Sequence, residues 1–181
     1  YFCYEFPRHI YEPELIKRTG NVLSRILLSP LRNLERKMDR NAISSANTII
    51  TLSSWMKNRI SEIYGLESYI VRPGVDTDFF SIDRNSVKKQ MVLSIGALWP
   101  FKGHEMAIET VSKVKKNIRP TLVIVADREF PGYEAVLEEV ASKLEVDIIL
   151  QKNISNEELR ILYSTGKAVL CCQHDEPYGL V

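Results

Sequence analysis

The chain has 181 residues, of which 45% are hydrophobic and 26% are charged, and its formal net charge at pH 7 is +1. This composition excludes a disordered or collagen-like protein, and the near-neutral charge gives no global field that would attract nucleic acid. No apolar run approaches the roughly 18 to 20 residues that are needed to span a bilayer.

The three cysteines favour a reducing compartment over a disulfide framework. Cys3, Cys171 and Cys172 are odd in number, and adjacent residues on a strand point to opposite faces. His174 and Asp175 follow them, but no second Cys or His pair stands at zinc-like spacing. We therefore predict a cytoplasmic protein without a metal site, in which the adjacent cysteines are small buried side chains on a strand.

Residues 1–14 are predicted to contain the end of a strand followed by a turn. Pro7 and Pro13 prevent a helix across this stretch, because proline lacks a backbone donor and clashes with the preceding turn. Residues 14–46 are predicted to be rich in helix, with an interruption at Pro30. One apolar row recurs there at helical spacing, and we expect it to be buried: Leu31, Leu34, Met38 and Ala42.

The same helical region is basic. From Glu14 to Arg40 the chain carries seven Lys or Arg against three Asp or Glu, a local balance of +4. Bulky apolar residues between Val22 and Leu28 lie among these cations, as in a helix that binds an anionic membrane surface and inserts its apolar face. A helix with a solvated charged face is the alternative, and the sequence leaves both interpretations open.

The next stretch predicts a strand, a helix and a second strand. Residues 47–52 and 68–72 are short apolar runs, and Ser53 and Ser54 are candidate caps for a helix that ends at Gly65. This order implies two parallel strands that are joined by a right-handed crossover.

From residue 90 onward, predicted strands and helices alternate. The strands are residues 91–96, 121–126, 147–151 and 168–172. These runs are too apolar to have a solvent-exposed face, so we expect helices on both sides of a parallel sheet. A capping box, Ser155 to Glu158, precedes the last helix. The predicted fold class is therefore α/β, with parallel, doubly wound, Rossmann-like sheets.

Two loops carry the candidate site, one after residues 91–96 and one after residues 168–172. Ligands of an open parallel sheet bind beyond the carboxyl ends of its strands. Lys102, Glu176 and Gly179 all fall at such places. An ammonium group close to a helix start suits a phosphate, whereas a carboxylate is better suited to sugar hydroxyls. We therefore predict a ligand that has both parts.

These loops also carry a resemblance to a known family. Residues 96–103, GALWPFKG, followed by residues 176–181, EPYGLV, resemble the donor-binding half of a retaining glycosyltransferase of family 4, which has the GT-B fold. The resemblance implies transfer of a hexose from a nucleoside-diphosphate sugar to a glycan, lipid-linked or small-molecule acceptor, with retention of configuration. It also implies that no metal and no other cofactor are required.

The resemblance further implies roles for single residues. Glu176 matches the first glutamate of the family's donor motif and is expected to bind sugar hydroxyls, while Lys102 is expected to bind the diphosphate. Both are candidate catalytic residues. The other residues that are implied to bind the donor are Gly96, Tyr178, Gly179 and Leu180.

The family's organisation implies two domains. Residues 1–75 resemble the C-terminal part of the acceptor-side Rossmann-like domain, and residues 76–181 resemble the donor-binding domain. The second glutamate of the motif would fall beyond Val181, so we expect a fragment that does not transfer sugar by itself. From the cysteines and the basic stretch, and not from the resemblance, we expect a cytoplasmic protein that can associate peripherally with the inner face of the membrane.

Two positions depart from the family's pattern and keep other functions open. Tyr4 stands where a histidine is usual, and Ala97 stands where an arginine usually follows the glycine. One alternative is therefore a GT-B domain that has lost turnover and serves as a sugar-nucleotide-binding or interaction module. A sugar-nucleotide epimerase on the same fold is another. His104 and His174 are interpreted as structural.

Overall fold

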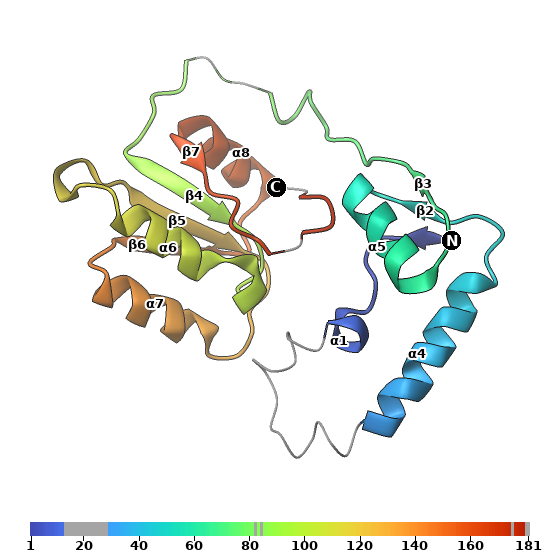
Figure 1. Cartoon of the computed structure of the whole chain (residues 1–181). Helices are drawn as coiled ribbons and strands as arrows, with labels where there is room; N and C mark the ends of the chain where they lie inside the picture. The colour runs from blue at the N-terminus through green and yellow to red at the C-terminus, as the bar shows by residue number, and fades with distance from the viewer. Residues whose placement is uncertain (13–28, 82, 84, 175, 180–181) are drawn as a thin grey trace. The chain divides into compact units, whose positions relative to one another are not determined.

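The computed structural model describes residues 1–12, 29–81, 83, 85–174 and 176–179, and the chain divides into two compact units (Figure 1). One unit consists of Tyr1–Gly74 with Pro177–Leu180, and the other of Val75–Glu176 with Val181. Every strand pair in the described residues is parallel. The predicted α/β fold with parallel sheets is confirmed.

The first unit is built on a short three-stranded sheet in the order β1-β2-β3: β1 (Phe2–Cys3), β2 (Ile50–Thr51) and β3 (Tyr69–Ile70). Helix α5 (Ser54–Tyr64) joins β2 to β3 and begins where the Ser53 Oγ accepts a hydrogen bond from the Met56 N–H at 3.1 Å. It ends at Gly65, whose φ of +70° suits glycine. The predicted parallel pair of strands on either side of a capped helix is confirmed.

The described residues of this unit form two more helices. Helix α1 (Arg8–Tyr11) is a single turn in a stretch for which we predict no helix. That prediction is wrong because Pro7 is the N-cap residue of this turn and does not interrupt it. Helix α4 (Ser29–Ser44) is tied to α1 by the Arg36 guanidinium, which donates to the Ile10 carbonyl oxygen at 2.8 and 3.2 Å.

The apolar row of α4 that we predict to be buried is exposed instead: Leu31, Leu34, Met38 and Ala42. The helix is held by a different face, on which Ile43 is buried. On that face the Asp39 carboxylate accepts hydrogen bonds from the hydroxyls of Tyr11 and Tyr64, at 2.8 and 2.7 Å. Periodicity finds an apolar row, but it does not say which face of the helix meets the core. What we predict for residues 14–28 lies outside the described residues.

The second unit contains a four-stranded sheet in the order β6-β5-β4-β7: β4 (Met91–Ile95), β5 (Thr121–Ala126), β6 (Ile148–Lys152) and β7 (Ala168–Val169). The chain moves outward from β4 through β5 to β6 and then returns to β7 on the other side of β4. The loops after β4 and β7 therefore leave the same edge of the sheet at a change of direction, which is where open α/β sheets bind ligands.

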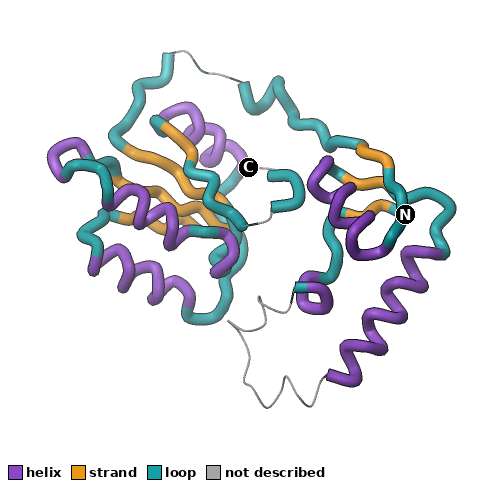
Figure 2. Tube along the Cα trace, viewed as in Figure 1, coloured by secondary structure: helices purple, strands orange, loops and turns teal. Residues whose placement is uncertain are grey.

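Helices cover both faces of this sheet (Figure 2). Helices α6 (His104–Ser112) and α7 (Tyr133–Lys143) share a core with Leu122 and Ile124, whereas α8 (Asn156–Thr165) packs with Val123 and Val125. Alternate residues of β5 thus serve two cores, as a doubly wound sheet requires. A short 3-10 helix, η2 (Lys116–Ile118), follows α6, and the capping box predicted at Ser155 is present.

Two details of this sheet differ from the prediction. The edge strand β6 is partly exposed to solvent, since it is the last strand in the order of this sheet and Ile149 is 48% exposed. Strand β7 ends at Val169, so Cys171 and Cys172 lie in the loop that follows, where Cys171 is exposed and Cys172 is half-buried. The prediction that both are buried on a strand is wrong.

Candidate functional site

The loop after β4 places a lysine beside a glycine at the carboxyl edge of the sheet. Gly96 follows β4 directly, and Lys102 ends the short 3-10 helix η1 (Pro100–Lys102). The lysine side chain folds back over Gly96, because its Cδ lies 3.6 Å from the point at which a Cβ of residue 96 would stand. A Cβ at residue 96 would thus stand in ordinary van der Waals contact with the Lys102 stem, so the stem packs directly over this glycine.

The loop after β7 is joined to the loop after β4 by backbone contacts. The His174 N–H donates to the Phe101 carbonyl oxygen at 3.1 Å. Gly103 has a φ of +75°, and a Cβ at this position would lie only 1.9 Å from the Cys172 carbonyl oxygen. Only glycine allows the two backbones to approach so closely. This approach brings the residues that follow Cys172 towards the Lys102 side chain.

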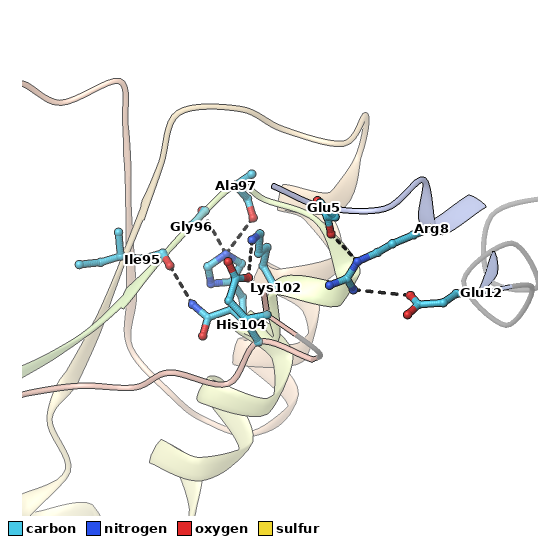
Figure 3. A network of polar contacts seen from close by, with 10 residues as sticks. Glu5, Arg8, Glu12, Ile95, Gly96, Ala97, Lys102 and His104 are labelled. Atoms are coloured by element: carbon cyan, nitrogen blue, oxygen red, sulfur yellow. Dashed lines mark hydrogen bonds and ion pairs between the residues drawn. The ribbon is translucent and has the colours of Figure 1, made fainter. Parts of the chain in front are cut away.

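Lys102, which is labelled in Figure 3, forms an ion pair with Glu176 at this edge. The Lys102 Nζ lies 2.8 Å from the Glu176 Oε2, and the two side chains are 24% and 29% exposed. The pair is partly desolvated, which strengthens electrostatic interactions relative to bulk water, yet it remains accessible. The ammonium group can bind an anion such as a phosphate, and the carboxylate can accept hydrogen bonds from hydroxyls. In the structure the two charges neutralise each other.

A buried histidine contacts the same loop from the other side. His104 is the first residue of α6, and its side chain is fully buried. Its Nδ1 lies 2.8 Å from the Ser94 Oγ. Its Nε2 lies 3.2 Å from the Gly96 oxygen and 3.1 Å from the Ala97 oxygen (Figure 3). Because carbonyl oxygens only accept, Nε2 carries the proton and Nδ1 accepts from the Ser94 hydroxyl. Burial lowers the pKa of His104, which favours the neutral form.

We expect His104 to make the stability of the second unit depend on pH. Its pKa in the folded chain lies below the ordinary value of 6.5. Below that pH the unfolded chain therefore binds a proton that the folded chain does not, and the free energy of unfolding decreases. The decrease is at most about 1.4 kcal/mol per pH unit for one proton, and it is absent well above pH 6.5.

Urea unfolding between about pH 7.5 and about pH 5.5 checks this expectation. The matched control is His104→Gln, which keeps a polar side chain but cannot titrate. The stability of the parent should fall more steeply on acidification than that of the variant, since all other ionisable groups are shared. If the free energy of unfolding depends on pH equally in the parent and in His104→Gln, His104 is not the group that causes the dependence.

The structure brings three of the predicted site residues together in the second unit: Gly96, Lys102 and Glu176. Tyr178 and Gly179 belong to the first unit, where the Tyr178 hydroxyl donates to the Pro73 oxygen at 3.1 Å. Their part in donor binding stays a prediction. Leu180 lies outside the described residues.

Sequence reasoning interprets His104 as structural and does not find its contacts with the backbone of the site. One signal is present in the sequence, because Ser94 is a hydroxyl residue within an otherwise apolar strand. A buried hydroxyl needs a polar partner, and a histidine at the start of the following helix can provide one. The carbonyl partners of His104 depend on the fold of the loop, which the sequence does not show.

Neither a metal centre nor a membrane span is found in the part of the chain that the structure describes. There, no group of three or more His, Cys, Asp or Glu side chains could hold a metal ion. No helix within the same ranges has the length and apolar character needed to cross a bilayer.

Comparisons with known proteins point to one kind of enzyme. The family model described as glycosyl transferases group 1 matches residues 76–181. A glycosyltransferase from Rickettsia africae ESF-5 has a similar structure, with a TM-score of 0.60 and 18% identity over 78% of this chain and 42% of that chain. A search of curated proteins gives no significant match.

Two further solved structures are similar. A mutant of TarM from S. aureus, in complex with fondaparinux, alpha-GlcNAc-glycerol and UDP, has a TM-score of 0.58 and 15% identity over 74% of this chain and 26% of that chain. AviGT4, a glycosyltransferase involved in avilamycin A biosynthesis, has a TM-score of 0.52 and 16% identity over 70% of this chain and 39% of that chain. The chain thus spans less than half of the length of these proteins, and at such identity the likeness shows the fold alone.

Proposed function

The chain belongs to the glycosyl transferases group 1 family, and from this premise we propose that it moves a hexose from a nucleoside-diphosphate sugar to an acceptor. The observation that carries the proposal is the ion pair between Lys102 and Glu176, 2.8 Å long, at the carboxyl edge of β4 and β7. A cation for a phosphate and a carboxylate for hydroxyls, side by side, match the two parts of such a donor. The UDP bound by TarM is of the same chemical class as the proposed leaving group.

In this proposal Lys102 and Glu176 bind different parts of the donor. Lys102 binds the diphosphate and stabilises the charge that develops as it departs, which needs no metal ion. Glu176 accepts hydrogen bonds from the sugar hydroxyls and fixes the orientation of the sugar. The bond from C1 of the sugar to the diphosphate oxygen breaks, and the acceptor oxygen bonds to C1 on the same face. The configuration at C1 is retained because the new bond forms on the face that the diphosphate leaves, and the acceptor proton passes to the departing diphosphate.

Release of nucleoside diphosphate tests the proposal. The full-length protein is incubated with UDP-, GDP- and ADP-hexoses and a panel of glycan and lipid-linked acceptors. We expect one donor to give equal amounts of nucleoside diphosphate and of a glycoside with the donor's anomeric configuration. A donor that binds without being turned over would contradict the proposal and favour the binding module, for which the neutral Ala97 is the supporting observation. Inversion of configuration would contradict retention alone.

We also propose that the protein binds anionic membranes peripherally through residues 14–40, whose local charge is +4. The exposed apolar row of α4 supports this, since Leu31, Leu34 and Met38 are 51%, 54% and 63% exposed. Cations attract the helix to anionic lipid, and an apolar row of this kind can then insert at the interface.

Co-sedimentation with vesicles checks the membrane proposal. The double variant Arg32→Glu with Lys37→Glu should bind anionic vesicles at least about tenfold more weakly than the parent, because each basic residue near the surface contributes about 1 kcal/mol. Arg36 is left unchanged because it holds α1 through the Ile10 oxygen. Parental binding should also weaken as salt screens the surface charge. The idea fails if the parent does not bind anionic vesicles at low salt.

A further inference from the structure

The backbone of the loop after β4 offers an anion-binding group that sequence motifs do not show. The Gly96 N–H donates to the Val125 oxygen at 2.9 Å, and the Leu98 N–H donates to the Arg128 oxygen at 2.7 Å. Between them, the Ala97 N–H makes no hydrogen bond with any other residue in the described ranges. A free backbone donor at the carboxyl edge of a parallel sheet is suited to an anionic ligand.

The contacts of His104 set the direction of this donor. The His104 Nε2–H points at the carbonyl oxygens of Gly96 and Ala97, at 3.2 and 3.1 Å. In a trans peptide the N–H points opposite to the C=O of the same unit. With the Gly96 oxygen turned towards the buried imidazole, the Ala97 N–H is turned away from it. The same peptide lies against Lys102, whose stem covers Gly96.

The imidazole itself has little freedom to move. The ring is fully buried, and its Nδ1 accepts a hydrogen bond from the Ser94 hydroxyl at 2.8 Å. A leucine of similar size would leave the Gly96 oxygen without this donor, whereas the Ala97 oxygen would keep the hydrogen bond from the Trp99 N–H at 2.8 Å. A partly buried carbonyl oxygen that loses its partner favours rotation of its peptide, here the Gly96–Ala97 peptide. The Ala97 side chain is neutral and apolar, so this residue can bind an anion only through its backbone N–H.

We propose that His104 is a positioning residue, which holds the Gly96–Ala97 peptide so that the Ala97 N–H binds the diphosphate of the donor beside Lys102. This inference rests on the proposed function, because it takes the diphosphate as the ligand. It adds a second donor to the phosphate site, one that is supplied by the backbone and controlled by a buried side chain that does not touch the ligand.

Three variants distinguish an effect of His104 on the Gly96–Ala97 peptide from a general loss of stability of the second unit. His104→Leu removes the donor to the two carbonyls. His104→Gln keeps an N–H donor on a side chain of comparable reach. Leu137→Ala is the control, because Leu137 is fully buried in α7 and its truncation destabilises the same unit through a cavity without changing a polar contact of the loop. Thermal unfolding of each variant shows how far stability alone has changed.

The first readout is the affinity for UDP, GDP and ADP, measured by calorimetric titration into the full-length protein. We expect His104→Leu to bind the preferred nucleotide about tenfold more weakly than the parent, as for the loss of one hydrogen bond to a charged group. His104→Gln should stay within about threefold of the parent, and Leu137→Ala should bind like the parent. Equal affinities of His104→Leu and Leu137→Ala would overturn the proposal, as would failure of His104→Gln to restore binding.

The second readout does not need a ligand. Hydrogen exchange of the Leu98 and Trp99 amides reports whether the loop is held, since these amides donate to the Arg128 and Ala97 oxygens. Exchange should be about tenfold faster in His104→Leu than in Leu137→Ala and should slow again in His104→Gln. If the parent binds no nucleotide, the proposed function fails while this readout still decides whether His104 holds the loop. Unchanged exchange in His104→Leu overturns the positioning role.

Discussion

Replacing Lys102 by alanine is expected to lower kcat for the nucleoside-diphosphate sugar by about 10²- to 10³-fold in the full-length protein. The lysine is assigned to a group whose negative charge grows as the bond to the sugar breaks. It therefore contributes more to the transition state than to the bound donor. The affinity for the donor should fall as well, because the ground state already carries the charge of the diphosphate.

Two further variants isolate the charge. Lys102→Met keeps most of the stem that lies against Gly96 and should lose nearly as much rate as the alanine variant. Lys115→Ala removes an exposed lysine from the same unit and should keep the parental rate. Steady-state kinetics of all three variants give the comparison. A Lys102→Met enzyme with the parental kcat would place the leaving-group cation elsewhere.

Replacing Gly103 by alanine is expected to cause the largest loss of stability in the second unit. A Cβ at this position would stand 1.9 Å from the Cys172 oxygen and 2.5 Å from the Cys172 carbonyl carbon, which are backbone atoms that cannot rotate away. The φ of +75° adds about 1 to 2 kcal/mol for a residue with a side chain. We expect a total loss of about 3 kcal/mol or more, and the loop that carries Glu176 should move away from Lys102.

Gly132→Ala is the matched control for this prediction. Gly132 has nearly the same φ, +78°, but a Cβ there would meet no atom within 4 Å. It should therefore lose only the backbone contribution of about 1 to 2 kcal/mol. Denaturant unfolding of both variants provides the test. Equal losses would show that the approach of Gly103 to Cys172 does not matter for stability.

The sequence predicts those parts of the fold that depend on short stretches of chain. Strand β5 is found at its predicted bounds, Thr121–Ala126, because its apolar run is flanked by polar residues and a proline. The caps at Ser53 and Ser155 are also correct, since a side chain that caps a helix binds an amide only a few residues away.

The wrong predictions concern the buried face of α4 and the exposure of β6, which both depend on the neighbours of these elements in the fold. The row of Leu31, Leu34 and Met38 has the spacing of a buried face, but α4 is anchored by Asp39 and Ile43 on another side. The apolar run of β6 gives no sign that the strand lies at an edge, where Ile149 is exposed. Both outcomes depend on which elements meet in the folded chain, and local periodicity does not contain that information.

In the candidate site, too, the sequence predicts the local features but not the contacts between distant segments. Lys102 and Glu176 can be selected from the sequence because each follows an apolar run at a glycine or proline, where a strand ends. Their 2.8 Å contact depends on the close approach of Gly103 to Cys172, between segments far apart in the chain. The hydrogen bonds of His104 to two carbonyl oxygens depend on the course of the loop, and only the folded backbone shows it.

In the proposed site, Lys102 binds the diphosphate of the donor and Glu176 binds its sugar. Calorimetric titration of the free nucleoside diphosphate into the parent, Lys102→Ala and Glu176→Gln proteins tests this division directly. Lys102→Ala should bind at least about tenfold more weakly, because a charge-assisted contact is lost. Glu176→Gln should bind as tightly as the parent or up to about fivefold more tightly, because the partly exposed ion pair no longer competes for the ammonium group. If Glu176→Gln instead loses as much affinity as Lys102→Ala, or if neither variant changes it, the division of roles at this site is contradicted.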